Sequence, residues 1–146
     1  MLSGSDMYNW LLYNCFMPIV IDASVVIAVI TNEDTKPALV EATSGEDLIA
    51  PGSIRWEIGN ALSAMVRRKR TTDREALNAL RIYQEIPIRE VDVNLEGALE
   101  IAARHLMYAY DAYMLRCSVE YRSPIISLDA GLKRIAAAER IPLVEY

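Results

Sequence analysis

The chain contains very little histidine and cysteine, which excludes several kinds of site. Its 146 residues include one histidine, His105, and two cysteines, Cys15 and Cys117. They show neither a CxxC pair nor the Cys/His spacing of a zinc site. We therefore expect Cys117 to be a buried helix residue in a reducing compartment, the cytoplasm, and His105 to be structural.

Long hydrophobic runs and an excess of positive charge are missing as well. No stretch approaches the roughly 20 apolar residues that a membrane-spanning helix needs, so no membrane partner is expected. The apolar segment 10–16 lacks the basic flank of a signal peptide. The formal net charge of −5 by itself argues against a nucleic-acid partner. It is a poor guide, however, where acids gather in one pocket and bases lie elsewhere.

What the chain does contain is enough apolar material for one compact domain. Hydrophobic residues make up 53% of the sequence, which is sufficient for a real core. The start of the chain is small and polar, and Met17 begins the first strand-like run. We therefore expect residues 1–16 to be an N-terminal extension, either non-native or disordered, and residues 17–146 to form the folded domain.

Strand-like and helix-like segments alternate along this domain. The pattern predicts strands at 18–21, 48–50, 88–91, 125–128 and 142–144. It predicts helices at 23–30, 36–43, 54–70, 74–85, 95–107, 112–121 and 132–138, the third of them capped by Ser53. Such alternation indicates an α/β fold, with a mostly parallel sheet of about five strands and helices on both faces.

Four acidic residues stand where such a fold builds a site. Asp22 and Asp129 end predicted strands, Asp111 precedes a predicted helix, and Glu57 lies within one. Ligands of open α/β sheets bind beyond the carboxyl ends of the strands. Carboxylates that converge there raise one another's pKa unless a cation lies between them. Mg²⁺ or Mn²⁺ is the natural cation for oxygen ligands.

A plainer interpretation exists for three of these acids. Aspartate is a favoured helix N-cap, and Asp22, Asp111 and Asp129 each precede a predicted helix. Glu57 differs because it lies at the edge of an apolar stripe, where a half-buried carboxylate needs a partner. Capping and metal binding remain compatible for the three aspartates.

The four segments that carry these acids, in this order, resemble the motifs of PIN-domain nucleases. The matching segments are 18–24 with Asp22, 53–60 with Glu57 and Asn60, 110–113 with Asp111, and 126–132 with Asp129. The resemblance covers about residues 17–146. Within the family the chain looks most like the VapC-type toxins of type II toxin–antitoxin systems.

The resemblance implies a metal-dependent endoribonuclease, a hydrolase of RNA phosphodiester bonds that uses Mg²⁺ or Mn²⁺. Asp22 and Asp111 would lie nearest the metal, and Glu57 and Asp129 would complete the site. Ser24 and Ser127 would hydrogen-bond water or phosphate, and Asn60 would orient Glu57. It also implies a homodimer that is silenced by a small antitoxin, which can place an arginine among the carboxylates.

Contacts to the RNA backbone are expected from exposed cations. We assign this role to Arg55, Arg67, Arg68 and Lys133. The run 67–70 has a second interpretation, because cations also complement the dipole at a helix C-terminus. Trp56 or Tyr113 could stack on unpaired bases, but for Trp56 we expect burial in the core.

Two rival functions remain open. The fold could serve as a catalytically silent PIN-fold interaction module, although intact acids at all four positions argue against this. An aspartate phosphotransfer or phosphatase domain also places an Asp at a strand end. The haloacid-dehalogenase-like form of this class needs a second Asp two residues after the first, where this chain has Ser24. The response-regulator-like form needs an adjacent acidic pair and a lysine at a late strand, and neither is evident.

Overall fold

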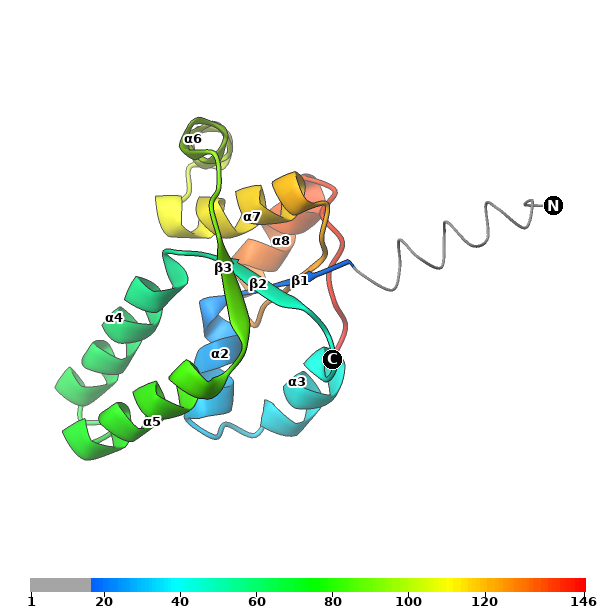
Figure 1. The fold of residues 1–146 in the computed structure, drawn as a ribbon. Helices are drawn as coiled ribbons and strands as arrows, with labels where there is room; N and C mark the ends of the chain where they lie inside the picture. Colours follow the sequence, from blue (N-terminus) through cyan, green and yellow to red (C-terminus); the bar gives the residue numbers. More distant parts are fainter. Residues whose placement is uncertain (1–16) are drawn as a thin grey trace, which may run out of the picture.

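The computed structural model describes residues 17–146, which form a sheet of four strands and seven helices (Figure 1). The strands are β1 (Ile19–Ile21), β2 (Leu48–Pro51), β3 (Ile88–Val91) and β4 (Ile125–Ile126). The helices are α2 (Ala23–Ile30), α3 (Lys36–Thr43), α4 (Ile54–Arg67), α5 (Asp73–Glu85), α6 (Leu95–His105), α7 (Ala109–Tyr121) and α8 (Ala130–Ala138). The predicted extension 1–16 lies outside the described residues.

All strand pairs in the sheet are parallel, in the order β3-β2-β1-β4. In β1, Val20 pairs with Ile49 on one side and with Ile125 on the other. The fifth predicted strand, 142–144, is reduced to an isolated parallel bridge between Leu143 and Ile125. The α/β fold is therefore confirmed, with a four-stranded sheet rather than one of about five strands.

The sheet is buried because helices cover both of its faces. Helices α2, α3, α4 and α5 lie on one side of the strands and α6, α7 and α8 on the other (Figure 1). All residues of β1, β2 and β4 are buried, which explains why these strands are apolar without alternation. This arrangement leaves the carboxyl ends of the strands as the edge where polar side chains can gather.

Helix ends differ from the expectation in informative ways. Helix α5 begins with a capping box between Thr72 and Glu75, in the break that the sequence predicts. Helix α4 ends at Arg67, earlier than expected, and Lys69 adopts a left-handed φ of 56° in the turn that follows. Ser53 occupies the N-cap position of α4, but its side chain makes no capping hydrogen bond. The basic residues 68–70 therefore lie in a turn rather than on a helix.

Helix α6 lies farther from the sheet than the other helices on its side (Figure 1). Its predicted apolar face is only partly covered, because Ala98 is buried whereas Leu95 and Leu99 are more than half exposed, at 57% and 53%. The helix packs mainly against α7. The guanidinium group of Arg116 packs against Gly97, so a side chain at this position would require Arg116 to shift.

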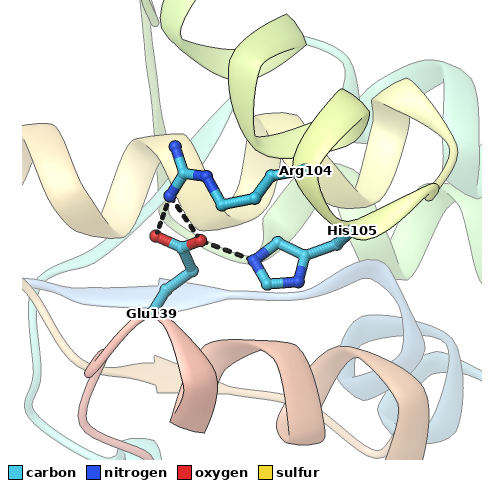
Figure 2. Close-up of polar contacts among 3 residues, drawn as sticks. All are labelled: Arg104, His105 and Glu139. Carbon is cyan, nitrogen blue, oxygen red and sulfur yellow. Dashed lines mark hydrogen bonds and ion pairs between the residues drawn. The ribbon is translucent and has the colours of Figure 1, made fainter.

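The C-terminus of α6 is tied to the C-terminus of α8 by a small charged cluster (Figure 2). Arg104 donates two hydrogen bonds to the Glu139 carboxylate, and His105 Nε2 lies 2.5 Å from Glu139 Oε1. This contact supports the structural assignment of His105. Cys117 is buried in α7, and burial raises the pKa of its thiol to about 12, so the thiol stays protonated. Within residues 17–146, no helix is both long enough and apolar enough to cross a membrane.

Candidate functional site

Asp22 lies at the carboxyl end of β1 and is 4% exposed. It occupies the N-cap position of α2, but its carboxylate makes no capping hydrogen bond, so the capping interpretation is wrong for its side chain. Its Oδ2 atom instead accepts hydrogen bonds from Ser24 Oγ at 2.5 Å and from Ser127 Oγ at 2.8 Å. A buried carboxylate held by two hydroxyl groups has a fixed position.

The two serines also join the segments that follow β1 and β4. Ser24 Oγ accepts a hydrogen bond from the Leu128 amide, and Ser127 Oγ accepts one from the Asp129 amide, both at 3.0 Å. Residues more than a hundred positions apart in the chain are thereby locked together at the edge of the sheet. These bonds set where Asp129 lies relative to Asp22.

Glu57 lies in the first turn of α4 and is half-buried. Burial, and then the negative charges of Asp22 and Asp111, raise the pKa of Glu57 from 4.5 to about 8. Ser53 Oγ donates a hydrogen bond of 3.4 Å to Glu57 Oε2, which offsets only part of this rise. Among residues 17–146, no hydrogen bond joins Asn60 to Glu57, so the orienting role of Asn60 stays a prediction.

Asp111 lies inside the first turn of α7, because this helix begins at Ala109 rather than at residue 112. The residue at the N-cap position is Tyr108, so the capping interpretation is wrong for Asp111. Burial, and then the negative charges of Asp22 and Asp129, raise the pKa of Asp111. The carboxylate therefore lies close enough to Asp22 and Asp129 for their charges to affect its protonation.

Asp129 is the acid for which capping is confirmed. Its Oδ1 atom accepts a hydrogen bond of 2.7 Å from the Leu132 amide at the start of α8. Its charge also reaches Asp111, as the raised pKa of Asp111 indicates. Each of the four acids therefore interacts electrostatically with at least one other. Glu57 interacts with Asp22 and Asp111, and Asp111 interacts with Asp22 and Asp129.

The chemistry of these donors fits a hard divalent cation. The acids are oxygen ligands whose mutual repulsion a cation would relieve. Among residues 17–146, however, no three His, Cys, Asp or Glu side chains lie close enough together to enclose an ion directly. Mg²⁺ does not require such a cage, because it usually binds one or two carboxylates and keeps several waters. The donor set therefore suits a hydrated ion.

A cleft of about 450 Å³ opens beside Glu57 between α2 and α4. It is lined by Ala23, Ser24, Ile27, Trp56, Glu57, Asn60, Ala61, Ala64 and Tyr110. The expected burial of Trp56 is wrong, because the side chain is 66% exposed. Trp56 precedes Glu57 on the first turn of α4, where the apolar stripe turns toward the core and Trp56 faces away from it. The sequence alone does not single out Tyr110, whose only signal is its position before Asp111.

The cations assigned to RNA binding lie in different settings. Arg55 forms an ion pair with Glu90, and Lys133 Nζ donates to Tyr146 Oη at 3.0 Å. Arg67 and Arg68 are exposed and form no ion pair with any residue in 17–146. A larger cavity of about 830 Å³ lies at the far end of α2, α4 and α5, and the cations that line it are Lys36, Arg70, Arg74 and Arg81. This cavity is separate from the carboxylates.

Comparison with known proteins identifies the class to which this fold and these acids belong. The pattern of the PIN domain matches residues 19–138, and the chain belongs to this family. A search of curated proteins found no match.

Several solved structures have a similar fold. PAE2754 from Pyrobaculum aerophilum is 20% identical, with a TM-score of 0.66 over 82% of this chain and 79% of its own. VapBC2 from Rickettsia felis, bound to a DNA fragment from its promoter, is 13% identical. Its TM-score is 0.61, and the match covers 87% of this chain and 97% of that chain. VapC20 from Mycobacterium tuberculosis, a toxin that cleaves the sarcin-ricin loop, is 13% identical. Its TM-score is 0.58, and the match covers 80% of this chain and 93% of that chain.

Proposed function

We propose that this PIN-domain protein is a metal-dependent endoribonuclease and the toxin of a type II toxin–antitoxin pair. The observation that carries the proposal is the electrostatic coupling of Asp22, Glu57, Asp111 and Asp129 at one edge of the sheet. A fold that only needed stability would not place Glu57 and Asp111 where neighbouring carboxylates raise their pKa values. Membership of the PIN domain family and the similar fold of the toxin VapC20 support the same activity.

Mg²⁺ or Mn²⁺ would be held by Asp22 and Asp111, with Glu57 and Asp129 completing the site directly or through water. A bound divalent ion neutralises the phosphodiester and lowers the pKa of a coordinated water. The hydrogen bonds from Ser24 and Ser127 hold one oxygen of Asp22, which leaves its other oxygen available as a ligand. Arg67, Arg68, Arg55 and Lys133 would contact RNA phosphates.

The proposal extends to partners. The similar fold of the toxin–antitoxin complex VapBC2 supports a separate antitoxin chain that restrains this protein. An antitoxin arginine placed among the four carboxylates would replace the charge of the metal. We also propose a homodimer that acts on RNA in the cytoplasm.

Metal-dependent cleavage tests the activity. Purified protein is incubated with a pool of structured RNAs, with EDTA, Mg²⁺ or Mn²⁺, beside the Asp22→Asn variant. We expect cleavage that needs the metal and is lost in Asp22→Asn, whereas Asp34→Asn, an exposed change outside the site, keeps full activity.

The same experiment separates the rival functions. An absence of cleavage and of metal binding, measured by calorimetry, would contradict the proposal and favour a silent interaction module. A phosphorylated aspartate after exposure to acetyl phosphate would favour the phosphotransfer class.

A further inference from the structure

Two aromatic side chains line the cleft beside the carboxylates without belonging to the core. Trp56 is 66% exposed and Tyr110 is 50% exposed, and both lie in the wall that also contains Glu57. A large aromatic side chain that stays in water does not gain the hydrophobic stabilisation that burial gives. Such side chains are enriched where a ligand or partner binds. Their placement therefore needs an explanation other than folding.

The same helices hold the two rings and two of the acids. Trp56 directly precedes Glu57 in the first turn of α4, and Tyr110 directly precedes Asp111 in the first turn of α7. The two rings are therefore the sequence neighbours of two of the acids, and Glu57 lies in the same cleft wall as both rings.

Neighbouring side chains restrict the orientation of both rings. The Arg55 guanidinium lies over the Trp56 indole, 5.9 Å from its centroid. The Tyr110 ring packs edge-on against Tyr113, with the centroids 6.0 Å apart. Rings held in this way lose little further freedom when a flat ligand stacks on them.

The cleft also offers polar groups suited to the edge of a flat ligand. Asn60 and Ser24 lie in the same wall as the two rings. In the part of the chain that the structure describes, the Asn60 side-chain amide makes no hydrogen bond, so its donor and acceptor atoms are both available. An unpaired nucleobase combines an apolar face with such a polar edge.

We propose that Trp56, Tyr110 and Asn60 form a binding site for one unpaired base of the RNA substrate. The two rings stack on the base, and the Asn60 amide hydrogen-bonds its edge. This inference rests on the proposed ribonuclease function, since the base belongs to the strand whose phosphate reaches the carboxylates.

Stacking suits a chain with a net charge of −5, because its contribution does not depend on attraction between a basic surface and phosphate. Bases in a duplex have their edges paired and their faces stacked on one another, so the site selects single-stranded RNA.

Trp56 itself supplies the first test. The chain has two tryptophans, so the Trp10→Phe variant of the full chain keeps Trp56 as the only indole fluorophore. This variant is titrated in EDTA with single-stranded RNA hexamers of each base, and with a duplex of the same sequences. We expect the single strands to quench the Trp56 fluorescence and the duplex to leave it almost unchanged. Equal quenching by the duplex, or no quenching by any hexamer, would overturn the proposal.

Variant affinities supply the second test, measured in EDTA by the fluorescence anisotropy of a labelled hexamer. Trp56→Ala should weaken binding about tenfold, and Trp56→Phe should weaken it less because a ring remains. Asn60→Ala should make the affinities for the hexamers of the four bases more nearly equal, because the amide that contacts the base edge is lost. Tyr108→Ala is the matched control, because Tyr108 is 87% exposed, lies two residues before Tyr110 and does not line the cleft. Wild-type affinity in Trp56→Ala would overturn the proposal.

The outcomes separate this site from the proposed activity. If RNA quenches Trp56 but is never cut with Mg²⁺, the nuclease function fails and the base site stands. If Trp56→Ala binds and cuts RNA like the wild type, the base site fails and the nuclease stands. If only a protein partner with an apolar anchor quenches Trp56, the cleft is a protein-docking site and the base site fails.

Discussion

Glu57 lies half-buried beside two other carboxylates, so its protonation is coupled to folding. Its pKa is raised from 4.5 to about 8 by burial and by Asp22 and Asp111. Between these two values the folded chain keeps a proton that the unfolded chain releases. The free energy of unfolding of the metal-free protein should therefore fall as the pH rises from 4.5 to 8, by on the order of 2 kcal/mol after allowance for solvent screening.

Urea unfolding in EDTA at several pH values measures this fall. Glu57→Gln should remove most of it, whereas the exposed change Glu100→Gln should leave it in place. Added Mg²⁺ should flatten the wild-type profile, because a cation stabilises the ionised carboxylates. A wild-type stability that does not depend on pH over this range would contradict the coupling.

Two buried serines should respond in opposite ways to the same substitution. Ser127→Ala removes a hydrogen bond to Asp22 and one from the Asp129 amide, so it should lower stability by about 1–3 kcal/mol. The Ser118 hydroxyl is buried, with no hydrogen-bond partner among residues 17–146, so Ser118→Ala should be neutral or stabilising. Chemical denaturation of both variants makes the comparison, and equal losses would mean that the Asp22 network adds nothing.

At the scale of elements, the C-terminus of α4 is a candidate surface for RNA phosphates. Arg67 ends this helix, and Arg68 begins the turn after it. Loss of one phosphate contact to single-stranded RNA should reduce the slope of log K against log[salt] by about 0.7. Arg67→Ala and Arg68→Ala should each show this change, measured by anisotropy in EDTA. Arg134→Ala, an exposed change on α8, serves as the control and should keep the wild-type slope. If Arg67→Ala and Arg68→Ala also keep that slope, these cations do not contact phosphate and only complement the dipole at the C-terminus of α4.

The Glu139 cluster joins two helices that are far apart in sequence (Figure 2). Glu139→Gln weakens the contacts with both Arg104 and His105. We expect the free energy of unfolding to fall by only about 1 kcal/mol, because the Arg104 side chain of the ion pair is exposed. Thermal unfolding measures the loss, and Glu145→Gln, an exposed change near the C-terminus, is the control. RNA cleavage should remain unchanged, since the cluster is not part of the carboxylate site.

At the scale of the whole molecule, the buried core formed by residues 17–146 runs from Ile19 to Ile141. We therefore predict that a chain beginning at Met17 unfolds cooperatively and cuts RNA like the full chain. Circular dichroism during heating and the cleavage assay check this, and light scattering of both forms tests the homodimer. Loss of cooperative unfolding in the shorter chain would show that residues 1–16 are part of the domain.

Much of this molecule was predictable because its signals are local. The β-branched run before Asp22 and the break before α5 depend on neighbouring residues, and the bounds of α2, α3 and β3 match the prediction. The sequence predicts a start of α7 at residue 112 because Asp111 is a favourable cap residue, but the helix begins earlier, at Ala109. Local preference therefore gave the correct element but the wrong role for this acid.

The sequence by itself determined the α/β alternation, the order of the four acids and the family to which they point, since periodicity and motif order are properties of the chain. Only the tertiary structure decided which acids are coupled, that Asp22 is held by Ser24 and Ser127, and that Trp56 faces a cleft. Those facts depend on burial and on contacts between distant segments. A carboxylate's pKa and an aromatic ring's exposure are set by what packs around them, and the residues next to them in the chain do not specify this.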